Sequence, residues 1–289
     1  MKNLTANVYV ETQWVSGSPT HPSAGSNSSF VVTSRGIVMI DAPSVPANAI
    51  EWRHRIEEKG KLIYLINTGC HSDHTAGNYF FPVPGIAHEG TSQAIPANLL
   101  FTDEDQRRKL RKNYPLCADL VNDYHIRLPS ITFSDRLSLH IGDHTFELIH
   151  LPGHTPGEIG IYLPQERVFF TGDNYANRLQ PKLSDCCPLE LLDSLRRMLA
   201  IDDVEYFVPG HGEVANKQAV REYMAVFQSF VDIIREVINK GMTREEAIDQ
   251  VHLPLPDSLV FLHPEPEQLK KDIGHLYDML SKPRERRVL

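Results

Sequence analysis

The chain has 289 residues, 41% hydrophobic and 23% charged, a composition typical of a globular protein with a full apolar core. Its formal net charge of −8 argues against nucleic-acid binding and against a polybasic attachment to membranes. The N-terminus lacks a signal-peptide pattern, no run is long enough for a membrane helix, and the four cysteines form no disulfide framework. We therefore expect a cytoplasmic protein with no nucleic-acid or membrane partner; a homo-oligomer stays open.

The N-terminal part has the pattern of strands followed by a helix. Short apolar runs predict strands at 8–10, 29–33, 37–41 and 62–66. Arg35-Gly36 predicts a tight turn between two of these strands. A helix is expected from Ala47 to Lys59, because Gly60 is a typical C-terminal signal, and another helix should begin near Asp73.

Residues 91–130 differ in character, since they are charged, helical in pattern and interrupted by three prolines. We interpret this segment as a helical insertion over the site, and a plain solvated helix pair is an equally good interpretation. The loops expected to shape a substrate pocket are 16–28, 91–130 and 174–188.

The second half repeats the β pattern and then becomes helical. Strands are predicted at 136–141, 145–151, 159–163 and 167–171, with Gly142-Asp143 as a hairpin turn between the first two. Helices are predicted from Pro188, after His211, around 243–250 and around 266–281. Two such halves, sheets face to face and helices outside, make an α/β four-layer αββα sandwich. We expect one domain over 1–289, with a helical C-terminal extension at 215–289.

Side chains that commonly bind metals follow four of the predicted strands. His71, Asp73 and His74 lie in the loop after strand 62–66. Three further residues stand in Gly- or Pro-bearing turns after later strands: His154, Asp173 and His211. Imidazole nitrogens and carboxylate oxygens are the donors that Zn²⁺ and similar ions take. These six residues are therefore candidate metal ligands.

Most of the 14 histidines carry the ordinary interpretation of surface or hydrogen-bonded side chains. It applies to the following eight: His54, His88, His125, His140, His144, His252, His263 and His275.

The ligand series resembles the metallo-β-lactamase superfamily over nearly the whole chain. That family has a His-x-His-x-Asp-His loop, a Gly-His-Thr-x-Gly turn, a Gly-Asp turn and a final Pro-Gly-His-Gly-like turn. The resemblance implies the four-layer fold with C-terminal helices and a site for one or two ions, Zn²⁺ first, with Fe or Mn as alternatives. It also implies that Asp73, His74 and His211 hold one ion and that Asp173 bridges or completes that site. His71 and His154 would bind the second ion, and Asp73 would orient the nucleophilic water.

Gly69 departs from the family pattern, because it stands where the first histidine of the loop is expected. Three consequences are open: a single ion in the complete site, a replacement ligand such as Cys70 or His21, or a coordination position left for substrate. Cys70 is better explained as a small packing residue than as a metal ligand.

The resemblance implies a metal-dependent hydrolase whose substrate is a small molecule, an ester, thioester, lactone or amide that metal-activated water cleaves. One alternative is a single-metal member that carries out hydrolytic dehalogenation or oxidises thiols or persulfides. The other is a member that binds a ligand without turnover.

Overall fold

The computed structural model describes residues 1–15, 23–100, 102–178, 183, 185–254 and 266–282. Within these ranges no helix is both long and apolar enough to cross a membrane.

The N-terminal half forms one sheet, here called sheet A. Its strands are β1 (Lys2–Asn3), β2 (Val8–Val15), β3 (Ser23–Thr33), β4 (Gly36–Ile40), β5 (Leu62–Ile66), β6 (Gly85–His88) and β7 (Ile131–Phe133). The strands from β1 to β4 pair antiparallel, whereas β4 to β7 pair parallel. The carboxyl end of β5, which leads into the loop of His71, therefore opens at one edge of this sheet.

The second half forms sheet B, which meets sheet A through its last strand. Its strands are β8 (Arg136–Ile141), β9 (His144–His150), β10 (Ile159–Leu163), β11 (Val168–Ala176) and β12 (Tyr206–His211). Four of them pair antiparallel in sequence order, and β12 lies parallel to β11. The pair His211 and Ser26 joins β12 to β3, so the two sheets meet where candidate ligands lie.

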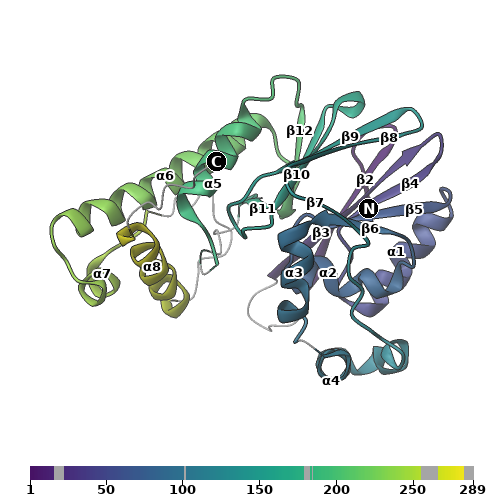
Figure 1. Cartoon of the computed structure of the whole chain (residues 1–289), viewed down its shortest axis with the longest axis horizontal. Coiled ribbons are helices and arrows are strands. Elements are labelled where there is room, and N and C mark those ends of the chain that lie inside the picture. Colours follow the sequence, from purple (N-terminus) through teal and green to yellow (C-terminus); the bar gives the residue numbers. More distant parts are fainter. Residues whose placement is uncertain (16–22, 101, 179–182, 184, 255–265, 283–289) are drawn as a thin grey trace.

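The helices flank these sheets. Those of the first half are α1 (Pro46–Glu57), α2 (Ser72–Thr75), α3 (Glu89–Asn98) and α4 (Asp103–Asn113), with the short helices η1 (Ala76–Phe80) and η2 (Pro115–Val121). Those of the second half are α5 (Pro188–Leu199), α6 (Lys217–Asn239), α7 (Arg244–Gln250) and α8 (Pro266–Ser281), with η3 (Pro164–Glu166) before β11. Figure 1 shows α1, α2 and α3 beside sheet A, and α6 extending away from sheet B with α7 and α8 at its far end.

Alternation along the strands places apolar side chains on both faces of each sheet. Val31 and Val38 face sheet B and pack with Phe146 and Leu148, whereas Phe30 faces the other way and packs against α1. The outer face of sheet B is covered in the same manner by α5, α6 and α8. The four-layer αββα fold class with C-terminal helices is therefore confirmed.

Two candidate ligands lie inside strands instead of in turns after them. Asp173 falls within β11, where the register with β12 shifts around Gly172, and His211 is the last residue of β12. The prediction of turns was wrong because a glycine was interpreted as a strand end. Gly172 has φ of +55°, a conformation that a bulge needs and that glycine adopts without strain.

The strand expected at 29–33 begins earlier, at Ser23, and runs through a serine-rich segment. Ser26 and Asn27 are buried, and their side chains bond backbone carbonyls of other segments. Polar side chains can occupy a buried strand when their hydrogen bonds are satisfied in this way. The segment expected as a loop over 16–28 is thus strand from residue 23, and residues 16–22 lie outside the described ranges.

Segment 91–130 makes contacts of two kinds. Near its start, the Thr91 hydroxyl donates to the Gly157 carbonyl in the loop of His154. Farther along, Leu110, Val121 and Tyr124 are buried in the apolar layer between sheet A and α1. Part of this segment therefore belongs to the outer helical layer of the fold.

Candidate metal centre

The loop after β5 supplies three of the six candidate ligands. His71 precedes the single turn of α2, which carries Asp73 and His74. The hydroxyl of Ser26 on β3 donates to the Asp73 carbonyl at 2.6 Å, which ties the helix to sheet A. Asn67 also donates to the His74 carbonyl. The backbone of this turn is therefore fixed from both sides.

The other three candidates come from sheet B. His154 lies in the loop between β9 and β10, Asp173 in the bulge of β11, and His211 at the end of β12. Asn174 positions the His154 loop, since its side-chain oxygen accepts from the His154 amide and its side-chain nitrogen donates to the Leu151 carbonyl.

The six side chains converge as two groups of three. The His71 cluster consists of His71, His154 and Asp173, and the His74 cluster consists of Asp73, His74 and His211; in each, the donor atoms lie within 4.8 Å of one another. His154 Nε2 lies 3.1 Å from His71 Nδ1, and His211 Nε2 lies 3.2 Å from Asp73 Oδ2. The structure thus brings together all six residues that the sequence singles out.

Asp173 connects the two clusters. Its Oδ1 lies 3.1 Å from His74 Nε2 and 3.3 Å from His211 Nε2, whereas its Oδ2 lies 3.5 Å from His154 Nε2. One carboxylate oxygen therefore faces each group, which is the geometry of a bridging ligand.

The charges in the His74 cluster are strongly coupled. Burial favours the neutral form of His211, but Asp173 and Asp73 outweigh it and raise the pKa of His211 to about 10. Burial likewise opposes ionisation of Asp73, yet the charge of His74 and the hydrogen bond from His211 hold the Asp73 pKa below its usual range. The pKa of His74 is raised well above its ordinary value against burial, chiefly by Asp173 and Asp73. Asp73 and Asp173 therefore stabilise positive charge in this cluster. Protonated His74 and His211 provide that charge when no other cation is bound.

The His71 cluster differs, because burial lowers the pKa of His154 to about 4. His154 is therefore a neutral imidazole at pH 7, the form in which histidine binds metals.

A divalent cation fits this donor set. His74 Nε2 and Asp173 Oδ1 are both buried, and neither forms a well-oriented hydrogen bond with any described residue, although they lie only 3.1 Å apart. Buried polar atoms without hydrogen bonds are costly, and a cation between them would satisfy both. Imidazole with carboxylate is also a donor set that Zn, Fe and Mn accept.

Asp41 holds His74 in the orientation that a ligand needs. Its carboxylate accepts from the amide and hydroxyl of Thr68 at 2.8 and 2.6 Å and lies 3.0 Å from His74 Nδ1. Because a carboxylate only accepts hydrogen bonds, Nδ1 carries the hydrogen and Nε2 faces the cluster. Asp185 stands in a similar relation to His71, with its Oδ2 at 3.5 Å from His71 Nε2.

Three residues can be considered as a replacement for the histidine that is missing at Gly69. Cys70 is 5% exposed and packs with Ala76, Ile95 and Leu99, and burial raises the pKa of its thiol to about 11, which suits a packing group. His21 lies outside the described residues. The carboxyl of Glu158 lies beside Gly69, and burial, followed by the nearby charge of Asp173, raises the Glu158 pKa to about 8.

Sequence reasoning missed Glu158, although one signal was present. It directly follows the Gly153-His154-Thr155-Pro156-Gly157 turn and directly precedes β10, so a charged residue stands at the start of a buried strand.

The histidines given an ordinary interpretation have other partners wherever their contacts are described. His88 stacks on His150, His144 lies 2.9 Å from Glu166, and His275 lies 2.7 Å from the Cys186 carbonyl. His263 is outside the described ranges.

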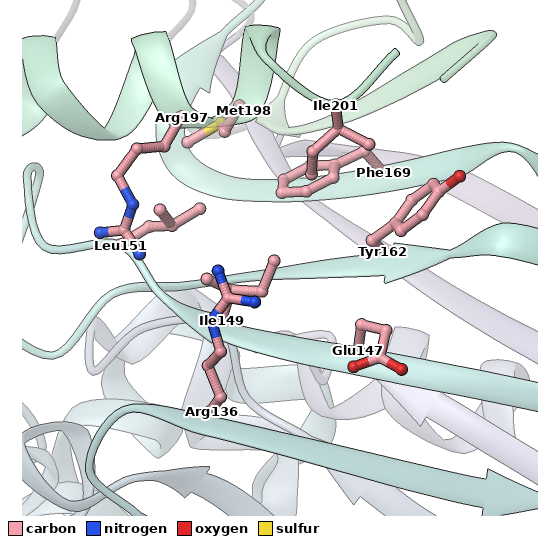
Figure 2. Close-up of a pocket in the computed structure, with 9 residues that line it drawn as sticks. All are labelled: Arg136, Glu147, Ile149, Leu151, Tyr162, Phe169, Arg197, Met198 and Ile201. Carbon is pink, nitrogen blue, oxygen red and sulfur yellow. The ribbon is translucent and has the colours of Figure 1, made fainter. Parts of the chain in front are cut away.

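A pocket of about 310 Å³ lies away from the metal-type clusters, on the outer face of sheet B. Figure 2 shows Arg136, Glu147 and Ile149 on the strands and Arg197 and Met198 on α5 around it. None of the six candidate ligands lines this pocket, so it does not serve the site.

Comparison with known proteins agrees with this fold. Residues 23–211 match the family model of the metallo-beta-lactamase superfamily, and the chain belongs to this family. The matched segment contains all six residues of the two clusters.

Two relatives and one solved structure show the range of similar proteins. A linear primary-alkylsulfatase from Pseudomonas sp. (strain ATCC 19151) is 26% identical over 163 residues, which cover 53% of this chain and 30% of that protein. A hydroxyacylglutathione hydrolase from Mesorhizobium japonicum is 31% identical over 125 residues, 42% of this chain and 46% of that protein. The solved inverting sec-alkylsulfatase Pisa1 from Pseudomonas sp. has a TM-score of 0.68 at 18% identity, covering 88% of this chain and 47% of that one. The matches thus span less than half the length of either relative.

Proposed function

We propose that this chain is a metal-dependent hydrolase that cleaves an ester, thioester, lactone or amide bond of a small molecule with water. The observation that carries the proposal is the convergence of two three-residue donor clusters on the bridging carboxylate of Asp173. Membership of the family supports it, as do two similar proteins whose names describe hydrolytic enzymes.

The His74 cluster would hold one divalent cation and the His71 cluster a second, with Asp173 contributing an oxygen to each. When bound, such a cation lowers the pKa of a water molecule towards about 7 and polarises the bond to be cleaved. Zn²⁺ suits both clusters, and Fe and Mn share these donor preferences.

Asp73 is suited to orient the attacking water and to receive its proton. Its side chain is 40% exposed, whereas that of His211 is 20% exposed and that of His74 is 2% exposed. Because its pKa lies below the usual range, the carboxylate is ionised at neutral pH and can accept a hydrogen bond from water.

The proposal predicts that Asp73→Ala lowers the turnover number for the best substrate by about 100-fold or more while the protein stays folded. The assay uses Zn²⁺- or Mn²⁺-loaded protein and a panel of chromogenic esters, thioesters, lactones and amides. The panel also contains a hydroxyacylglutathione and a primary alkyl sulfate, the substrates named by the two relatives. Asp202→Ala is the matched control, since the Asp202 side chain is fully exposed and lies outside the site.

Full turnover by the Asp73→Ala protein would contradict the role given to Asp73. A metal-loaded wild-type protein that cleaves nothing in the panel would contradict the proposed activity. No contact in the described part of the chain favours dehalogenation, persulfide oxidation or binding without turnover over hydrolysis.

A further inference from the structure

The space beside Gly69 is filled by the carboxyl group of Glu158. A Cβ atom at residue 69 would lie 2.6 Å from Glu158 Oε2 and 3.0 Å from Oε1, and a Cβ at Gly172 would lie 2.4 Å from Oε1. All three distances are shorter than a van der Waals contact, so the carboxyl group fits only because both residues are glycine. Glu158 therefore occupies volume that a histidine at position 69 would need.

The Glu158 carboxyl group is held between the loop that carries His154 and the strand that carries Asp173. Its Oε1 accepts from the Asp173 amide at 2.9 Å, and its Oε2 accepts from the hydroxyl of Thr155, the neighbour of His154, at 2.9 Å. The next residue, Ile159, donates its amide to the Thr68 carbonyl at 2.9 Å, which fixes the start of β10 against the loop of Gly69. Glu158 thus contacts both sheet-B segments that supply this cluster.

Glu158 forms no ion pair with a described residue, and burial and the nearby charge of Asp173 both oppose its ionisation. The residue is 1% exposed, and the ion pairs of the described residues at this site involve Asp41, Asp73, Asp173 and Asp185 but not Glu158. A buried carboxylate next to a second carboxylate is costly unless a positive charge lies nearby. A divalent cation in the His71 cluster would provide that charge.

We propose that Glu158 replaces the absent side chain of position 69, and that the second divalent cation, in the His71 cluster, depends on its carboxylate. It acts as a positioning residue that fixes the Asp173 amide and the Thr155 hydroxyl and adds negative charge where the resemblance places a neutral imidazole. This inference rests on the proposed metal centre and adds that the chain binds two ions despite Gly69.

The test measures Zn²⁺ and Mn²⁺ bound per chain by equilibrium dialysis and mass spectrometry for the wild type and Glu158→Gln. A glutamine is isosteric and keeps both hydrogen bonds, because its oxygen can accept from the Asp173 amide and its nitrogen can donate to the Thr155 hydroxyl. Glu147→Gln removes the same charge from a half-exposed position on β9 and serves as the control.

We expect the wild type and Glu147→Gln to bind two ions per chain, and Glu158→Gln to bind its second ion about 10–100-fold more weakly. Equal counts and affinities for wild type and Glu158→Gln overturn the inference, whether both bind two ions or both bind one. A wild type that binds no ion instead overturns the proposed function itself, so the two failures are distinguishable.

Substitutions at positions 69 and 158 test whether a histidine at position 69 and the Glu158 side chain would occupy the same volume. Gly69→His alone should weaken the second ion, since the new ring collides with Glu158. Adding Glu158→Ser to Gly69→His removes the collision and should restore two ions per chain. Tight binding of two ions by the Gly69→His protein would show that Glu158 does not occupy the place of the missing histidine.

Discussion

At the scale of single residues, protons and metal ions compete for the same atoms. His211 lies between Asp73 and Asp173, and its pKa of about 10 means that the metal-free protein carries a proton there at pH 7. A metal ligand must be a neutral imidazole, so a bound cation takes the place of that proton. His154, with its pKa of about 4, has no proton to lose at pH 7.

This difference predicts that Zn²⁺ binding at pH 7 releases protons, and that the apparent affinity rises with pH. The sign follows from the raised pKa: between pH 6 and 8 the His211 proton must be displaced, and raising the pH makes that easier by about tenfold per unit for each proton. Isothermal titration calorimetry in two buffers of different ionisation enthalpy measures the protons released. Release of none, or proton uptake, would contradict the charge coupling described for the His74 cluster.

The sequence was sufficient to select the six candidate donor residues that the structure brings together, because their types and their places beside apolar strands single them out. It was insufficient to find Glu158. That residue is adjacent to Gly69 only through the pairing of distant strands, and a lone glutamate after a glycine has many ordinary explanations.

At the scale of elements, the site depends on the contact between β3 and β12. The sequence predicted strand 62–66 and helix 266–281 with the bounds that the structure shows. It placed the start of β3 six residues too late, because the serine-rich segment has no apolar alternation. That segment is a strand because it pairs with β2, and Asn27 also donates hydrogen bonds beside His211; no local pattern reveals either contact.

Asn27 is the key residue of this contact. Its side-chain nitrogen donates to the carbonyls of Pro209 and Gly212 at 2.7 and 2.8 Å, one on each side of His211. Asn27→Ala removes two buried hydrogen bonds and leaves the Gly212 carbonyl with only the Thr12 hydroxyl at 3.4 Å, so we expect the free energy of unfolding to fall by about 1–3 kcal/mol. Zn²⁺ affinity should fall as well, because the His211 turn loses its support.

Urea unfolding of the metal-free proteins measures this effect, and Asn122→Ala is the control. Asn122 is exposed and only accepts a hydrogen bond from Arg111, so its replacement should change stability by no more than about 0.5 kcal/mol. If the two variants unfolded at the same urea concentration, Asn27 would not be the support that the geometry indicates.

At the scale of the whole molecule, the two halves of the chain meet at the candidate metal centre. The loop after β5 contributes His71, Asp73 and His74 from the side of sheet A, and sheet B contributes the other three donors. The sequence predicted this layered fold because each half repeats the same order of strands and helices. It could not predict which side chain from the second half lies beside Gly69, so Glu158 was not among the replacement ligands considered for that position.

The central claim is that both clusters bind divalent cations around Asp173. Anomalous diffraction at the zinc absorption edge, from crystals of the wild-type protein grown with Zn²⁺, tests it most directly. The account predicts one anomalous peak among Asp73, His74 and His211 and a second among His71, His154 and Asp173. A map with peaks only elsewhere, or with none, would contradict it.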